Sequence, residues 1–87
     1  MRVAVIGTGL IGGSIGLALV ELGHEVVGFD RDRDRLVRAR ELGAVTVVAE
    51  DVGAAAAGAE VAFVAVPVGA IAGAVVLVRA LREPSAR

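Results

Sequence analysis

The sequence has no cysteine, lysine, tyrosine, tryptophan, asparagine or glutamine, and it has a single histidine. Thiol nucleophiles, Schiff-base lysines and Tyr–Lys proton relays are therefore excluded within this chain. One histidine without cysteine cannot build a multi-ligand zinc site, and the lack of cysteine also excludes a disulfide framework. Backbone groups, a few carboxylates and arginine are left for chemistry, a set that suits binding better than catalysis.

Neither sign of charge dominates the chain. Nine arginines face ten acidic residues, for a net charge of −1, so no basic face for nucleic acid or anionic lipid is indicated. A length of 87 residues allows one small domain, and 56% hydrophobic residues exclude a disordered chain.

Two uncharged runs, residues 3–20 and 61–78, reach the lower length limit for a membrane-spanning helix. Glycines interrupt the first run, and Pro67 followed two residues later by Gly69 breaks the second. The chain also has no Trp or Tyr for an aromatic belt at the membrane interface. A strand followed by a buried helix explains each run better, so we expect no membrane insertion.

Predicted strands and helices alternate along the chain. The strands are expected at 2–6, 25–29, 45–48 and 60–66, and the helices at 10–22, 32–42, 51–57 and 70–81. Asp32 is the expected N-cap of the second helix, and Asp51 or the residue before it is that of the third. Pro67 is expected to end the fourth strand. Spacing predicts two inner helix faces, made of Ile11, Ile15, Ala18 and Leu22 and of Leu36, Ala39 and Leu42.

This alternation implies parallel strands joined by right-handed crossovers, in the order 3-2-1-4. Such a sheet is the first part of a doubly wound α/β fold of the Rossmann type, with helices on both faces. We expect an incomplete dinucleotide-binding domain over residues 1–82 and a polar tail over 83–87. With strand four at the sheet edge, its open backbone groups are expected to favour self-association.

Residues 7–12 (Gly-Thr-Gly-Leu-Ile-Gly) match the Gly-x-Gly-x-x-Gly pattern between a predicted strand and a predicted helix. In this pattern Gly7 permits the tight turn, Gly9 lets the backbone approach a pyrophosphate, and Gly12 lets the helix pack closely on the strand. The free amides of Leu10 and Ile11 would point toward the anion. The alternative is a flexible glycine-rich turn without a ligand.

Asp30 ends the second strand, 23 positions after Gly7, where a carboxylate can accept hydrogen bonds from ribose hydroxyls and repel a 2′-phosphate. Asp30 therefore predicts NAD as the coenzyme, or it is a solvated turn residue. Arg31 could stack on adenine or grip a 2′-phosphate, which keeps NADP possible. Arg33 and Arg35 are interpreted as part of a solvated, alternating-charge helix face.

Val66 and Pro67 end strand four, which flanks the switch point beside strand one, so we expect them to line the coenzyme cleft. A plain strand end is the alternative. His24 precedes the second strand, at the edge of the sheet opposite the ligand, and is interpreted as a surface residue. Ser14 lies one turn into the first helix, where it supports the phosphate loop or packs internally.

The stretch 5–14 (Val-Ile-Gly-Thr-Gly-Leu-Ile-Gly-Gly-Ser) resembles the opening of prephenate/arogenate dehydrogenases of tyrosine biosynthesis. The segments 27–31, 39–44 and 65–68 are also similar to that family, so the resemblance covers residues 2–82. It implies oxidative decarboxylation of prephenate to 4-hydroxyphenylpyruvate in the cytoplasm, with hydride passed to NAD or NADP. It gives coenzyme roles to Leu10, Ile11, Asp30, Arg31, Val66 and Pro67.

The family's catalytic His-Pro motif and the arginines of its helical second domain have no counterpart in this chain. We therefore expect no catalytic residue here and no activity of the chain alone. The front half of another nicotinamide enzyme, such as a hydroxyacid or pyrroline-carboxylate reductase, and a non-catalytic dinucleotide-binding module are the alternatives.

Overall fold

The computed structural model describes residues 1–68 and 71–77. Its elements are β1 (Arg2–Ile6), α1 (Leu10–Glu21), β2 (Glu25–Phe29), α2 (Arg33–Glu41), β3 (Val47–Val48), α3 (Val52–Ala56), β4 (Val61–Val68) and β5 (Ile71–Leu77). The first three predicted helices agree with these bounds to within about one residue at each end. The third strand is shorter than the predicted range of 45–48.

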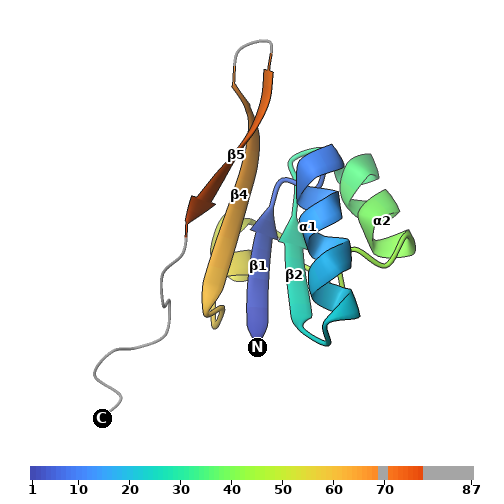
Figure 1. The fold of residues 1–87 in the computed structure, drawn as a ribbon, viewed down its shortest axis with the longest axis vertical. Helices are drawn as coiled ribbons and strands as arrows, with labels where there is room; N and C mark the ends of the chain where they lie inside the picture. The colour runs from blue at the N-terminus through green and yellow to red at the C-terminus, as the bar shows by residue number, and fades with distance from the viewer. Residues whose placement is uncertain (69–70, 78–87) are drawn as a thin grey trace.

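The sheet has the strand order β3-β2-β1-β4-β5, and the first four strands are parallel. The predicted order 3-2-1-4 is therefore confirmed. Helices α1 and α2 cover one face of the sheet and α3 lies behind it (Figure 1). Parallel strands joined by helices on both faces make this a Rossmann-like α/β fold.

Two glycines bring α1 very close to its neighbours. Gly12 and Gly16 are the buried residues of the helix. A Cβ on Gly16 would collide with the carbonyl oxygen of Ala44, and a Cβ on Gly12 would collide with that of Gly7. Glycine at these two positions therefore sets how deeply α1 lies on the rest of the fold.

This close approach corrects the predicted inner face of α1. Ile11 and Ile15 are only half-buried, and Ala18 and Leu22 are exposed. The helix is apolar on every side, so the spacing of its large residues did not identify the face that packs. In α2 the prediction holds for Leu36 and Ala39 and is wrong for Leu42, which follows the helix as its C-cap and is exposed.

Side-chain caps begin helices α2 and α3, as predicted for Asp32 and, as one of two candidates, for Asp51. The Asp32 carboxylate accepts a hydrogen bond from the Arg35 amide at 3.2 Å, and the Asp51 carboxylate accepts one from the Ala54 amide at 2.7 Å. Each cap satisfies one of the amides that a helix leaves unpaired at its start. Asp32 thereby fixes where α2 leaves the end of β2.

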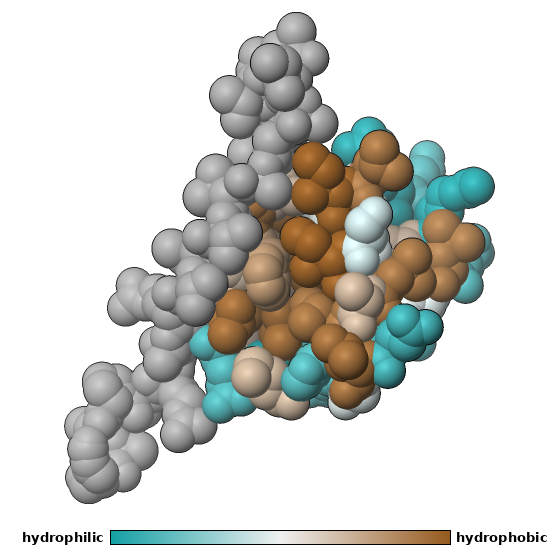
Figure 2. All heavy atoms as spheres, viewed as in Figure 1, coloured by the Kyte–Doolittle hydropathy of each residue, from teal (hydrophilic) through white to brown (hydrophobic). Residues whose placement is uncertain are grey.

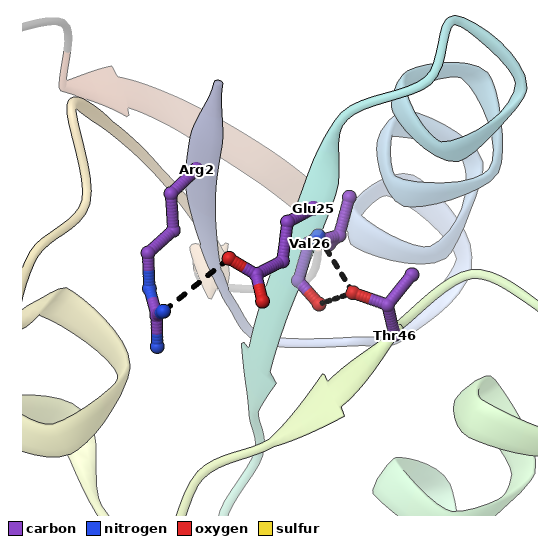
Figure 3. A network of polar contacts seen from close by, with 4 residues as sticks. All are labelled: Arg2, Glu25, Val26 and Thr46. Carbon is purple, nitrogen blue, oxygen red and sulfur yellow. Dashed lines mark hydrogen bonds and ion pairs between the residues drawn. The ribbon is translucent and has the colours of Figure 1, made fainter.

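Polar contacts tie the amino-terminal ends of the strands together (Figure 3). Arg2 Nη1 of β1 lies 3.3 Å from Glu25 Oε1 of β2. The Thr46 hydroxyl accepts a hydrogen bond from the Val26 amide at 2.9 Å and donates one to the Val26 carbonyl at 3.0 Å. These contacts align β1, β2 and the entry to β3 at the edge opposite the carboxyl ends.

The helix predicted over 70–81 is wrong for Ile71–Leu77, which form the strand β5 antiparallel to β4. Residues 70 and 78–81 of that prediction, and the tail over 83–87, lie outside the described residues. A short apolar run fits a strand as well as a helix, and Ile71, Val75 and Val76 are β-branched. Only two residues, the first a glycine, separate β4 from β5, a hairpin signal that the helical spacing obscured.

Pro67 does not end β4, which continues to Val68. The pairing of β4 with β1 ends at the Ile6–Val64 pair, so Pro67 is paired on one side only, with Ala72 of β5. The missing amide of proline is tolerated where a strand has one partner. Because β5 covers β4, the prediction that β4 is an open edge is also wrong.

The face of the molecule that carries α1 is largely apolar, whereas charged side chains gather on the flank that carries α2 (Figure 2). Leu10, Leu17 and Leu22 are among the exposed large hydrophobic residues of this face. Within residues 1–68 and 71–77, no helix is long and apolar enough to cross a membrane.

We expect Gly16→Ala to destabilise the fold by about 1–3 kcal/mol, because the added methyl group meets the Ala44 backbone and α1 must move outward. Gly13→Ala is the matched control, since its Cβ would meet only the Thr8 carbonyl oxygen at 3.6 Å. This control should gain about 0.5–1 kcal/mol from helix propensity. Urea unfolding of the two variants measures both effects, and equal stability of the pair would contradict the packing described.

Candidate functional site

A cleft of about 770 Å³ lies at the carboxyl ends of the parallel strands. Its walls come from the turn after β1, the starts of α1 and α2, the end of β2, Val52 of α3 and Ala65 of β4. Seven of the residues predicted for the site line it, namely Gly7, Gly9, Leu10, Ile11, Gly12, Asp30 and Arg31. The fold therefore brings these residues together, while their binding role stays a prediction.

The three glycines of the turn differ in what the fold itself requires of them. Gly7 has a φ of +94°, and a Cβ there would collide with the Ala65 carbonyl. A Cβ on Gly12 would collide with the Gly7 carbonyl, whereas the nearest atoms to a Cβ on Gly9 belong to the Arg35 side chain, at 3.8 Å. The fold thus leaves room for a side chain at position 9, and this open space fits a ligand that approaches the backbone.

The amino terminus of α1 is ready to receive an anion. Gly9 is its N-cap and supplies no side-chain hydrogen bond, and the first turn holds no acidic residue. The first amides of a helix have no partner within the helix, so those of Leu10 and Ile11 are available, with the positive end of the helix dipole behind them. A phosphate group suits this position.

Asp30 is buried at 8% exposure and faces the glycine turn rather than the solvent. Its Oδ2 accepts hydrogen bonds from the Thr8 amide at 2.7 Å and the Thr8 hydroxyl at 3.1 Å. Its Oδ1 accepts one from the Asp32 amide at 2.8 Å. The alternative of a solvated turn residue is therefore wrong, and Asp30 joins the end of β2 to the turn after β1.

The pKa of Asp30 lies below its ordinary value of 3.8. Burial raises this pKa, but the hydrogen bonds from Asp32 and Thr8 and the positive charge of Arg35 lower it by more. The site therefore keeps a charged carboxylate at its centre at neutral pH.

Two arginines line the cleft beside Asp30. Arg31 was expected there, but Arg35 was interpreted as a solvated residue and was missed. In the described part of the chain neither forms an ion pair, whereas Arg33 lies 3.9 Å from Glu50 and fits the solvated interpretation. Arg35 follows the N-cap Asp32 by three positions, on the first turn of a helix that starts at the ligand edge, and this spacing could have identified it.

The other residues discussed from the sequence do not line the cleft, or their side chains lie outside the described residues. The Ser14 hydroxyl donates to the Leu10 carbonyl at 2.8 Å, so it supports the first turn of α1. His24 Nδ1 lies 3.0 Å from the α-amino group of Met1, at the opposite edge of the sheet as expected. Val66 and Pro67 belong to β4, and their side chains lie outside the described residues.

No group of three or more histidine, cysteine or acidic residues that could hold a metal ion occurs within residues 1–68 and 71–77.

The contribution of Asp30 to stability should depend on pH. Because its folded-state pKa is depressed, the contribution is fully present above the unfolded-state pKa and is lost as pH falls through the folded-state pKa. We expect the difference in unfolding free energy between wild type and Asp30→Asn to be constant near neutral pH and to shrink below about pH 4. Urea unfolding over a pH series tests this, and a difference independent of pH would contradict the assigned hydrogen bonds.

Comparisons with known proteins agree with this geometry. Residues 2–85 match the model of the family described as NADP oxidoreductase, coenzyme F420-dependent. The crystal structure of Synechocystis arogenate dehydrogenase is similar to this chain, with a TM-score of 0.68 and 30% sequence identity. The match covers 74% of this chain and 23% of the arogenate dehydrogenase chain, so this chain spans about a quarter of that protein's length.

No curated protein sequence matches the chain. The solved structure supports the resemblance to the nucleotide-binding part of prephenate/arogenate dehydrogenases, and the family model extends over nearly the whole chain. With its Rossmann-like sheet and its open glycine turn, the chain belongs to the NADP oxidoreductase, coenzyme F420-dependent family.

Proposed function

We propose that this chain is the coenzyme-binding part of a cytoplasmic oxidoreductase that decarboxylates prephenate or arogenate oxidatively in tyrosine biosynthesis. The open space at Gly9, above the uncapped start of α1, is the observation that carries the coenzyme role. The likeness to arogenate dehydrogenase supports the choice of substrate.

In this proposal different residues of the cleft bind different parts of the coenzyme. The amides of Leu10 and Ile11 hold the pyrophosphate, and Gly9 lets it approach. Asp30 accepts a hydrogen bond from the adenosine ribose, and Arg31 lies at the adenine end. Val66 and Pro67, which follow the part of β4 beside β1, are assigned to the nicotinamide end. When bound, the nicotinamide would supply the acceptor for the hydride that the substrate loses.

The described cleft offers no group suited to removing a substrate proton. Its ionisable side chains are Asp30, Arg31, Asp32 and Arg35. Both oxygens of Asp30 accept hydrogen bonds, Asp32 caps α2, and arginine stays protonated. We therefore propose that the general base and the substrate-binding groups are supplied from outside these residues.

A second proposal, another nicotinamide-dependent reductase or dehydrogenase, is favoured by the breadth of the family description, which names an NADP oxidoreductase and no prephenate. A non-catalytic dinucleotide-binding module would show coenzyme binding without any homologous catalytic part.

We also propose that copies of the chain associate through the outer edge of β5, which is the last strand of the described sheet.

Gly9→Val should weaken dinucleotide binding at least tenfold without unfolding the domain. Its side chain fills the space that a pyrophosphate needs, while the nearest atoms of the fold are those of the flexible Arg35 side chain. Isothermal titration with NAD and NADP measures binding, and thermal unfolding checks the fold. Gly13→Ala, in the same stretch, should bind like wild type, and equal affinity of Gly9→Val and wild type would refute the assignment of the glycine turn.

The chain alone should bind coenzyme and yet show no reduction of NAD or NADP with prephenate or arogenate, because the described residues of the cleft include no general base. Coenzyme absorbance at substrate concentrations up to the millimolar range measures this. Titration of the same preparation with NAD shows that the cleft is intact. Turnover by the isolated chain would place the catalytic groups within it and overturn this part of the proposal.

A further inference from the structure

Hydrogen bonds within the protein limit how many more Asp30 can accept from a ligand. A carboxylate has two oxygens with about two acceptor positions each. Thr8 fills both positions of Oδ2, one through its amide and one through its hydroxyl, and the Asp32 amide fills one position of Oδ1. One position, on Oδ1, is left for a ligand.

Burial and a neighbouring backbone hydrogen bond hold Thr8 and Asp30 in this arrangement. Thr8 is 5% exposed and Asp30 is 8% exposed, so water cannot easily replace the threonine hydroxyl. The Gly7 amide donates to the Phe29 carbonyl at 2.7 Å, which holds the turn against the end of β2 immediately before Asp30. Thr8 is therefore kept beside Oδ2 by this neighbouring backbone contact as well as by its own amide and hydroxyl.

A ribose with two adjacent hydroxyls can donate two hydrogen bonds to a carboxylate only when both oxygens have a free position. We infer that Thr8 is a specificity-determining positioning residue, whose hydroxyl limits Asp30 to one ribose hydroxyl and so weakens the discrimination between NAD and NADP. The inference rests on the proposed coenzyme role and deepens it by naming the group that sets coenzyme preference.

The charges around Asp30 agree with this inference. Three hydrogen bonds and the positive charge of Arg35 offset the carboxylate charge. Arg31 and Arg35 line the same cleft and form no ion pair in the described part of the chain. A 2′-phosphate entering here meets a carboxylate whose charge is already offset, with the Arg31 guanidinium as a further positive charge in the same cleft.

The wild-type chain tests the hydrogen-bond count directly. Binding of ADP, 2′-deoxy-ADP and 3′-deoxy-ADP is measured by titration. We expect one of the two deoxy analogues to bind about tenfold more weakly than ADP, the scale of a lost hydrogen bond to a charged group, and the other to bind like ADP. Comparable losses for both analogues, or for neither, would overturn the inference. Absence of ADP binding would overturn the proposed function and this inference with it.

Thr8→Val and Thr8→Ser test the role of the hydroxyl. Valine keeps the shape and the backbone amide but frees one position on Oδ2, so both deoxy analogues should lose affinity and the NAD-to-NADP affinity ratio should rise about fivefold. Serine keeps the hydroxyl and should behave like wild type. Dinucleotide binding with an unchanged ratio and an unchanged analogue pattern in Thr8→Val would refute the role of Thr8. If Thr8→Val does not fold, the wild-type analogue series decides the matter.

Discussion

The close contact between α1 and the backbone around it is the constraint on which the rest of the structure depends. At Gly12 and Gly16 the helix touches the carbonyl groups of Gly7 and Ala44, so its distance from the sheet is set by backbone atoms instead of side chains. Backbone contacts are far less adjustable than contacts between flexible side chains. The start of α1 is consequently held at a fixed height above the ends of β1 and β4, which is where a phosphate group must be met.

A second set of contacts joins this fixed helix start to the neighbouring strand. Asp30 at the end of β2 accepts from the amide and hydroxyl of Thr8, and the Asp32 that follows it caps α2. The turn after β1, the end of β2 and the start of α2 therefore form one hydrogen-bonded unit. In such a unit a change at Thr8 or Asp30 alters both the shape of the turn and the charge presented to a ligand.

The parallel sheet and the glycine turn could be predicted because each leaves a local signal. Short β-branched runs mark the strands, and the acidic residue 23 positions after Gly7 has the spacing of a dinucleotide fold. The packing face of α1 could not be predicted, because apolar residues surround this helix and its two buried residues, Gly12 and Gly16, are glycines without side chains. Arg35 was missed because an alternating-charge run such as 30–41 looks the same whether one of its arginines lines a cleft or none does.

The direction of Asp30 could not be predicted either. Thr8, which donates two of its three hydrogen bonds, lies 22 residues away and becomes a neighbour only when β1 and β2 pair. The segment 71–77 shows a different limit. Its apolar residues satisfy helical spacing and strand composition equally well, and the choice depends on pairing with β4, a contact that the spacing of residues within the segment does not reveal.

The antiparallel strand β5 changes how the chain travels back across the sheet. After β4 reaches the ligand edge, a doubly wound fold normally returns through a helix, which advances only about 1.5 Å per residue. A strand advances about 3.3 Å per residue, so the seven residues of β5 cover roughly 23 Å, a distance that would take a helix about 15 residues. At Leu77 the chain has therefore returned to the same edge of the sheet that a helix would reach, with about half as many residues.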